Sequence, residues 1–154
     1  MSTGFRQHLR RALELARQAR DHGNHPFGAL LVDPRGNVVL EAENTVRTDK
    51  DVTAHAETNL MRMASARFEP DFLERCTLYT STEPCAMCAG AIYWGNVRRI
   101  VFGLSQEQIR SISSHNPENM QLAITSREIF ERGDQVSGPH LPRESSAVHD
   151  GFWD

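Results

Sequence analysis

The sequence has few of the features that mark membrane-bound, secreted or disulfide-rich proteins. None of its apolar runs approaches the roughly 20 residues that span a bilayer, and residues 1–11 lack the apolar core of a secretion signal. Its cysteines number three, and an odd number excludes a complete disulfide framework. We therefore expect a cytoplasmic protein without a membrane partner, whose thiols stay reduced and can serve as metal ligands.

The sequence also has no excess of basic charge. Its formal net charge is -3 at pH 7, and acidic and basic residues are mixed along the chain. Only the first twenty residues are basic, and a run of this kind is typical of the solvated face of a helix. A protein that binds a nucleic acid backbone usually shows a basic stripe. We therefore expect no nucleic acid partner.

The hydrophobic content and the order of apolar patterns predict one α/β domain over residues 1–154. Hydrophobic residues make up 39% of the chain, which is enough for a continuous core. Residues 104–120 show no clear period and are expected to form a long loop. Strands alternating with helices predict a sheet covered by helices, partly parallel after a first hairpin. The expected helices are 4–21, 54–66 with Thr53 as its N-cap, 84–95 and 125–133, and the expected strands are 28–33, 37–43, 76–81 and 98–103.

Two short motifs together predict a metal site. Cys85 and Cys88 stand two residues apart at the start of an expected helix, where two thiolates can converge on one ion. His55 lies near the start of another expected helix and can supply a nitrogen ligand. Two thiolates and one imidazole suit Zn²⁺ and leave one coordination position for water.

Glu57 turns this metal site into a hypothesis about catalysis. It stands two residues after His55, so its carboxylate can approach a water molecule at the metal without ligating the ion. A structural zinc site needs a fourth ligand and has no use for such an acid. A CxxC pair or a His-Ala-Glu triplet alone is weak evidence, and a non-catalytic scaffold stabilised by zinc is the alternative from another functional class.

The combined pattern H-x-E…P-C-x-x-C is the signature of zinc nucleobase deaminases. The sequence resembles the cytidine deaminase-like superfamily, and within it the branch of guanine deaminase, fungal cytosine deaminase and the tRNA adenosine deaminase. The resemblance covers about residues 5–103 and includes "PFGALLV", "AEN", "TAHAE", "LYTSTEPCAMCAGAIYW" and "RIVFG". It implies a three-layer α-β-α sandwich with a central mixed five-stranded sheet, and a homodimer.

The resemblance also implies a role for individual residues. His55, Cys85 and Cys88 would bind Zn²⁺, and Glu57 would move the proton while water replaces a ring amino group and ammonia leaves. The other implied residues contact the substrate. They are Asn44 with its amide, Phe27 as an apolar wall, Ala56 with its backbone N–H and Glu83 with its backbone carbonyl.

Further contacts are expected from the end of the chain. In the guanine deaminase branch a tryptophan borders the base pocket at the position of Trp94. In free-base enzymes the chain end folds over the site, so residues 137–154, here called the C-terminal tail, are expected to cover it. Phe152 and Trp153 would then enclose a planar ring, and Asp150 or Asp154 would accept its N–H bonds. The alternative is that both rings anchor the tail on the core or on a neighbouring subunit.

The substrate is the least determined feature. Guanine deaminases of this branch place an aspartate in the loop after the fourth strand, whereas this loop offers Ser113, Ser114, His115 and Asn116 and no aspartate. Such neutral groups suit cytosine or an s-triazine as well as guanine, and His115 is either a substrate contact or a surface residue. The sequence thus predicts deamination of a small amino-substituted heterocycle, and the alternative is a nucleoside or tRNA adenosine deaminase.

Overall fold

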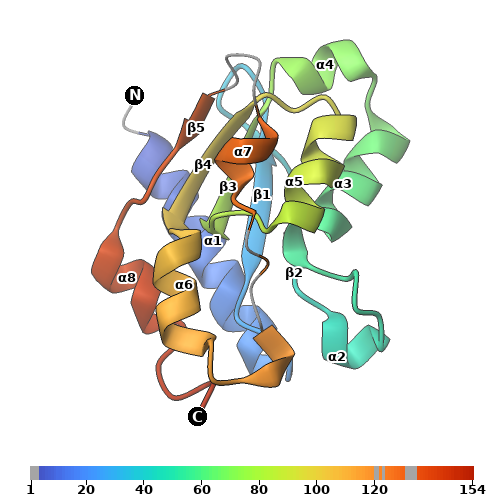
Figure 1. The fold of residues 1–154 in the computed structure, drawn as a ribbon. Coiled ribbons are helices and arrows are strands. Elements are labelled where there is room, and N and C mark those ends of the chain that lie inside the picture. The colour runs from blue at the N-terminus through green and yellow to red at the C-terminus, as the bar shows by residue number, and fades with distance from the viewer. Residues whose placement is uncertain (1–3, 120–121, 123, 131–134) are drawn as a thin grey trace.

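The structure, a computed structural model, describes residues 4–119, 122, 124–130 and 135–154, and these surround one five-stranded sheet (Figure 1). The strand order is β2-β1-β3-β4-β5. The strands are β1 (Gly28–Val32), β2 (Val38–Glu43), β3 (Thr77–Thr82), β4 (Arg99–Leu104) and β5 (Gln135–Ser137). The helices are α1 (Gly4–Asp21), α2 (Val46–Asp49), α3 (Ala56–Arg67), α4 (Pro70–Glu74), α5 (Ala86–Trp94), α6 (Gln106–Ser113), α7 (Ser126–Ile129) and α8 (Pro142–Ala147), with a 3₁₀ turn η1 (Pro117–Asn119).

The sheet is mixed, as predicted. β1 pairs antiparallel with both β2 and β3, whereas β3 with β4 and β4 with β5 are parallel. A two-residue alternation sends the side chains of β1 to opposite faces. Leu30 and Val32 pack with α1, and Ala29 and Leu31 pack in the core below α3 and α5. β1 is therefore buried on both faces, which explains why it is apolar throughout.

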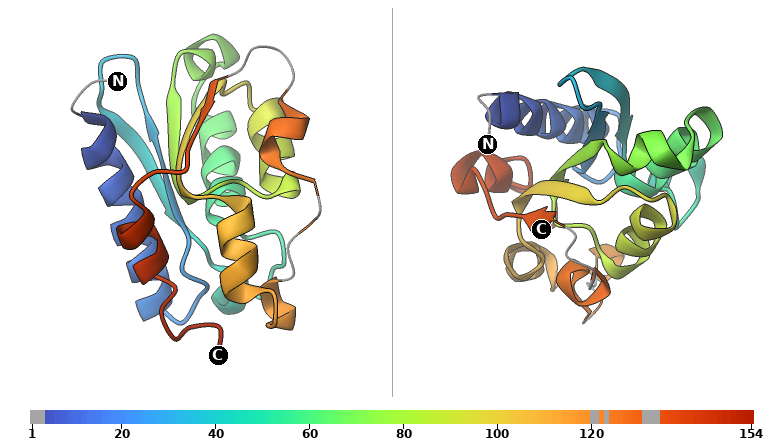
Figure 2. Two further views of the ribbon diagram at one scale, coloured as in Figure 1. Left: turned by 60° about the vertical axis from the view of Figure 1, so that its left-hand side comes forward. Right: turned by 90° about the horizontal axis from the view of Figure 1, so that it is seen from above.

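Helices cover both faces of this sheet, so the molecule has three layers (Figure 2). α1 and α8 lie on one face, and α3 and α5 lie side by side on the other. α1 buries a stripe of apolar residues that includes Leu9, Ala12 and Ala16 at helical spacing. The predicted α-β-α sandwich is confirmed. None of the helices within the described residues is long and apolar enough to cross a membrane.

The helices that carry the motif begin one or two residues later than the sequence predicts. α3 starts at Ala56 with His55 as its N-cap, so the expectation of Thr53 as the N-cap was wrong. Thr53 instead donates its hydroxyl to Asp51 at 2.7 Å. α5 starts at Ala86 with Cys85 as its N-cap, so the expected start at residue 84 was too early. Two of the expected zinc ligands thus occupy the same position on two neighbouring helices.

The long loop expected within residues 104–120 starts only after Ser113, because helix α6 (Gln106–Ser113) precedes it. Helix α6 forms because Ser105 and Gln108 make a capping box, in which each side chain bonds the other residue's backbone N–H. The helix has only two apolar residues, Ile109 and Ile112, so the sequence offers few positions from which a helical period can be recognised. Of the helix expected over 125–133, α7 forms the first part, and residues 131–133 lie outside the described residues.

Candidate active site

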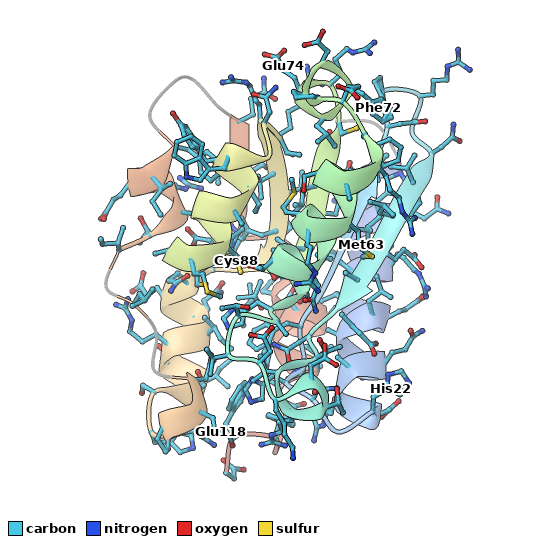
Figure 3. All side chains as sticks on the ribbon, turned by 90° about the vertical axis from the view of Figure 1, so that its right-hand side faces the viewer. His22, Met63, Phe72, Glu74, Cys88 and Glu118 are labelled. Carbon is cyan, nitrogen blue, oxygen red and sulfur yellow. The ribbon has the colours of Figure 1, made fainter. Side chains whose placement is uncertain are left out.

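The strands and helices bring the predicted zinc ligands together at one point. His55 and Cys85 lie at the starts of α3 and α5, and Cys88 lies on the first turn of α5. One donor atom from each of the three lies within 4.8 Å of the other two. Figure 3 shows Cys88 at the lower end of α5, on the side that faces α3.

The spacing of these donors suits zinc. His55 Nδ1 lies 3.6 Å from Cys85 Sγ. Zn–N and Zn–S bonds of about 2.0 and 2.3 Å in a tetrahedron place nitrogen and sulfur about 3.5 Å apart. The observed distance matches this value, and two sulfurs with one imidazole are a donor set that zinc prefers. Three protein ligands leave a fourth position, as in catalytic rather than structural zinc sites.

The same groups shift one another's pKa. The hydrogen bond from Cys88 lowers the pKa of the Cys85 thiol well below its ordinary value, and the hydrogen bond with His55 lowers it further. Burial lowers the pKa of His55, but the hydrogen bond and charge of Cys85 outweigh it and raise that pKa. Two helix N-termini also direct unpaired backbone N–H groups at this point. The site therefore favours the thiolate form of Cys85, which is the form that binds a metal, whereas the hydrogen bond with Cys85 and burial raise the pKa of the Cys88 thiol.

Glu57 lies on the first turn of α3, next to these ligands. Its side chain is 6% exposed. Burial raises the pKa of the Glu57 carboxyl to about 7, and the charge of Cys85 adds to this shift. The carboxyl can therefore both take up and release a proton near neutral pH.

A cavity of about 250 Å³ opens onto the cluster, and its lining includes His55, Glu57 and Cys85. This volume is below the range of about 300–1,000 Å³ typical for drug-sized ligands, so it suits a small ring. Other predicted residues also line it, namely Phe27, Asn44 and Glu83. Further lining residues that the sequence did not single out are His25, Val46, Val52, Thr82, Met87, Glu118, Asn119 and Leu122.

Asn44 is oriented by its own loop. Its side-chain Oδ1 accepts from the backbone N–H of Val46 at 3.0 Å, and the residue is 1% exposed. Within the described residues its Nδ2 has no hydrogen bond acceptor. The bond from Val46 fixes which side of the amide is oxygen, so the Nδ2 group can offer its N–H donors to a ligand in the cavity.

The carboxylate of Glu83 is used by the protein itself. It accepts from the backbone N–H of Gln106 at 2.9 Å and from the hydroxyl of Ser126. These bonds attach the starts of α6 and α7 to the loop that carries Cys85. The side chain thus fixes this loop, which leaves the predicted role of Glu83 to its backbone carbonyl.

The loop after α6 contributes a carboxylate that the sequence analysis missed. Glu118 lines the cavity, pairs with Arg47 at 3.1 and 2.8 Å, and contacts His25 at 3.2 Å. Arg47 lowers the pKa of Glu118 to about 2, and His25 contributes as well. Glu118 thus adds a negative charge to the neutral groups that the sequence analysis named in this loop. The sequence feature that could have indicated this carboxylate is Glu118 itself, an acidic residue in the loop between Pro117 and Asn119.

The residues expected from the chain end lie next to the cavity wall. Trp153 is 2% exposed and its ring contacts those of His25 and Phe27, with centroids 5.2 and 6.1 Å apart. Neither Phe152 nor Trp153 is among the described residues that line the cavity. The Phe152 ring lies below the guanidinium of Arg47 at 5.1 Å. Both rings therefore pack against residues of the cavity wall on the side that faces away from the cavity.

Four other predicted contacts also fall outside the cavity lining. His115 donates its Nε2 proton to the Trp153 carbonyl at 2.8 Å, and Asp154 is mostly exposed. Ala56 is fully buried, and its N–H is one of the first of α3, which have no partner inside the helix. Trp94 is 86% exposed at the end of α5, beside a separate cleft that Tyr93 and Phe130 also line. The expectation that Trp94 borders the pocket of its own chain was wrong, because the helix directs it to the surface.

Comparison with known proteins was made at the level of families, sequences and structures. The family model described as "Cytidine and deoxycytidylate deaminase zinc-binding region" matches residues 4–104. A protein of Schizosaccharomyces pombe named "Probable cytosine deaminase" is 45% identical over 150 residues, which cover 96% of this chain and 91% of that protein. The guanine deaminase of Bacillus subtilis is 42% identical over 95 residues, covering 61% of this chain and 60% of the enzyme.

Solved structures share the fold. A structure from a study of tRNA:A34 deaminases, which edit A to I at the wobble position of transfer RNA, superposes with a TM-score of 0.71. It is 29% identical and covers 96% of this chain and 99% of its own. The guanine deaminase of Nitrosomonas europaea superposes with a TM-score of 0.78 at 26% identity, covering 94% of this chain and 82% of its own.

Proposed function

The chain belongs to the cytidine and deoxycytidylate deaminase family, and from this premise we propose that it hydrolytically deaminates a small free base in a zinc-dependent reaction. The observation that supports this proposal most strongly is the cluster of His55, Cys85 and Cys88 beside a cavity. Glu57 and Asn44 also line this cavity. A zinc-stabilised scaffold would not need a buried acid beside an open cavity. In this proposal, residues 1–154 form one deaminase domain.

The reaction that we propose replaces a ring amino group by oxygen from water. When bound to His55, Cys85 and Cys88, zinc supplies the Lewis acidity that makes water a nucleophile near neutral pH. Glu57 accepts a proton from the attacking water and passes it to the ring nitrogen next to the reacting carbon. It then moves the remaining hydroxyl proton to the amino nitrogen. The C–N bond then breaks, ammonia leaves, and a ring carbonyl remains.

Asn44 and the backbone near Glu83 would hold the ring. The Nδ2 group of Asn44 donates to a ring carbonyl, since the bond from Val46 to Oδ1 fixes the orientation of the amide. The carbonyl of Glu83 accepts from the amino group, and the Ala56 N–H donates to the ring. Phe27 forms an apolar wall that excludes water from the reacting carbon.

Cytosine is the substrate that we propose among guanine-like, cytosine-like and s-triazine-like bases. The cavity lining includes Glu118, Asn119 and Leu122, which lie after residue 104 in a part of the chain that the family model does not cover. The match to the S. pombe protein spans 96% of this chain and hence this part, whereas the guanine deaminase match spans 61%. This longer match supports a cytosine substrate over guanine. The alternative of a tRNA adenosine deaminase is favoured by the superposition with the wobble-editing structure.

Ammonia release from a substrate panel tests the proposal. The panel contains cytosine, guanine, ammeline as an s-triazine, cytidine, adenosine and a tRNA anticodon stem-loop. We expect the highest kcat/KM with cytosine and at least a hundredfold lower value with cytidine, since the cavity of about 250 Å³ is small. Preferred turnover of the stem-loop or of nucleosides would contradict the free-base proposal. Absence of ammonia from every compound would favour the scaffold.

A homodimer and a cytoplasmic location complete the proposal. Trp94 is 86% exposed, and a large aromatic ring in water is commonly covered by a partner. Light scattering is expected to give twice the mass of 17.4 kDa, and Trp94→Glu is expected to yield monomers. An unchanged mass for this variant would remove Trp94 from the interface.

A further inference from the structure

Thr58 contacts one of the proposed zinc ligands from the neighbouring helix. Its hydroxyl oxygen lies 3.2 Å from Cys88 Sγ, across the junction of α3 and α5. Cys88 is fully buried, so water cannot hydrogen-bond to its sulfur. We propose that Thr58 is a positioning residue of the zinc site, whose hydroxyl donates to Cys88 and sets how strongly this sulfur binds the metal. This inference rests on the zinc site of the proposed function and adds a residue to it.

The direction of this hydrogen bond follows from the chemistry of the ligand. A cysteine that ligates a metal is a thiolate, which can only accept. The Thr58 hydroxyl is therefore the donor in the zinc form. A donor to a ligand sulfur stabilises its thiolate form against protonation, which favours metal binding, and fixes the direction of the sulfur.

The local backbone explains why the hydroxyl turns toward Cys88. A threonine in a helix usually donates to the carbonyl four residues earlier, which here is that of Ala54. That carbonyl already accepts from the backbone N–H of Thr45 at 3.0 Å and from Nδ2 of Asn59 at 3.3 Å. With both lone pairs of Ala54 in use, Cys88 is the acceptor that remains within reach of Thr58.

The two thiolates are hydrogen-bonded in different ways. Cys85 receives the backbone N–H of Cys88, a donor that every residue except proline supplies at that position. Cys88 receives a side-chain hydroxyl, so its donor depends on the identity of residue 58. A substitution at residue 58 can therefore change the zinc affinity of the site while all three ligands stay the same.

The test measures metal binding directly and needs no substrate. Thr58→Val keeps the branched shape and removes the donor, and Thr58→Ser keeps the donor. Competition with a chromophoric chelator gives the Kd for Zn²⁺, and Co²⁺ substitution gives the sulfur-to-metal charge-transfer band. We expect Thr58→Val to bind Zn²⁺ about tenfold more weakly, with the Co²⁺ band at longer wavelength. Thr58→Ser is expected to restore both values.

Controls separate this inference from the proposed function. Ser65→Ala, on the same helix, removes a hydroxyl that bonds the Met61 carbonyl, and it is expected to change neither value. Thr58→Ala serves as a second donor-free variant, so that a folding defect of one variant does not decide the test. If wild type binds zinc and both donor-free variants match it in Kd and in Co²⁺ spectrum, the role of Thr58 is refuted. If wild type itself fails to bind zinc, the proposed function fails first.

Discussion

The indole N–H of Trp153 donates to Nδ1 of His149 at 3.1 Å, and both residues are 2% exposed. Their rings are stacked at 22°, and the Trp153 ring also contacts two cavity-wall residues, His25 and Phe27. The penultimate residue of the chain is therefore part of the packed protein. In this arrangement the C-terminal tail stabilises the wall of the cavity.

Trp153→Ala should destabilise the protein and widen the cavity. Loss of a buried tryptophan costs about 3–5 kcal/mol, because a void remains. We expect the Tm to fall and the KM for cytosine to rise, while zinc content stays constant. Trp153→Phe keeps most of the packing and loses only the bond to His149, so it should cost about 1 kcal/mol. A loss of turnover at unchanged Tm would instead show that the tail acts as a lid.

His149 should make stability depend on pH. Burial lowers its pKa from 6.5 to about 4, and the charge of Arg20 acts in the same direction. Between these values the unfolded chain binds a proton that the folded chain does not, so stability falls as the pH falls. The expected loss is about 2 kcal/mol between pH 7 and pH 5. Urea unfolding of wild type and His149→Gln at both pH values measures it, and equal slopes of stability against pH would contradict the assignment.

Glu57→Gln should abolish turnover and retain zinc. The amide has the same shape but cannot move a proton, and general acid–base catalysis contributes about 10²–10⁴-fold. We expect ammonia release from cytosine to fall by at least a hundredfold, with zinc content by mass spectrometry unchanged. Glu107→Gln changes an exposed acid on α6 and is the matched control. Full activity of the Glu57 variant would rule out its role in proton transfer.

Asn44→Asp should separate the two functions of this side chain. The carboxylate still accepts from Val46 N–H but offers no donor to a ring carbonyl. We expect kcat/KM to fall by at least about 10², since a donor to the substrate is lost, while the Tm changes little. Asn44→Ala loses the bond to Val46 as well and should also lower the Tm. If Asn44→Asp retained wild-type kcat/KM, the proposed ring contact would be wrong.

The sequence alone determined the parts of the fold and of the site that depend on short segments. The helix at Gly4–Asp21 follows from its apolar period, and the structure has the same bounds. His55, Cys85 and Cys88 could be recognised because each motif spans a few residues at the start of a helix. The polar helix α6 could not be recognised from its period, since its capping box and not its apolar face marks it.

Only the tertiary structure decided which side chains surround the site. Thr58 meets Cys88 because α3 and α5 lie side by side, and Glu118 meets His25 across 93 positions of sequence. Trp94 points to the surface although its motif suggested a pocket, because the rotation of α5 fixes its direction. Such contacts depend on how helices pack across the sheet. No local pattern in the sequence encodes them, whereas a metal motif at a helix start is local and therefore readable.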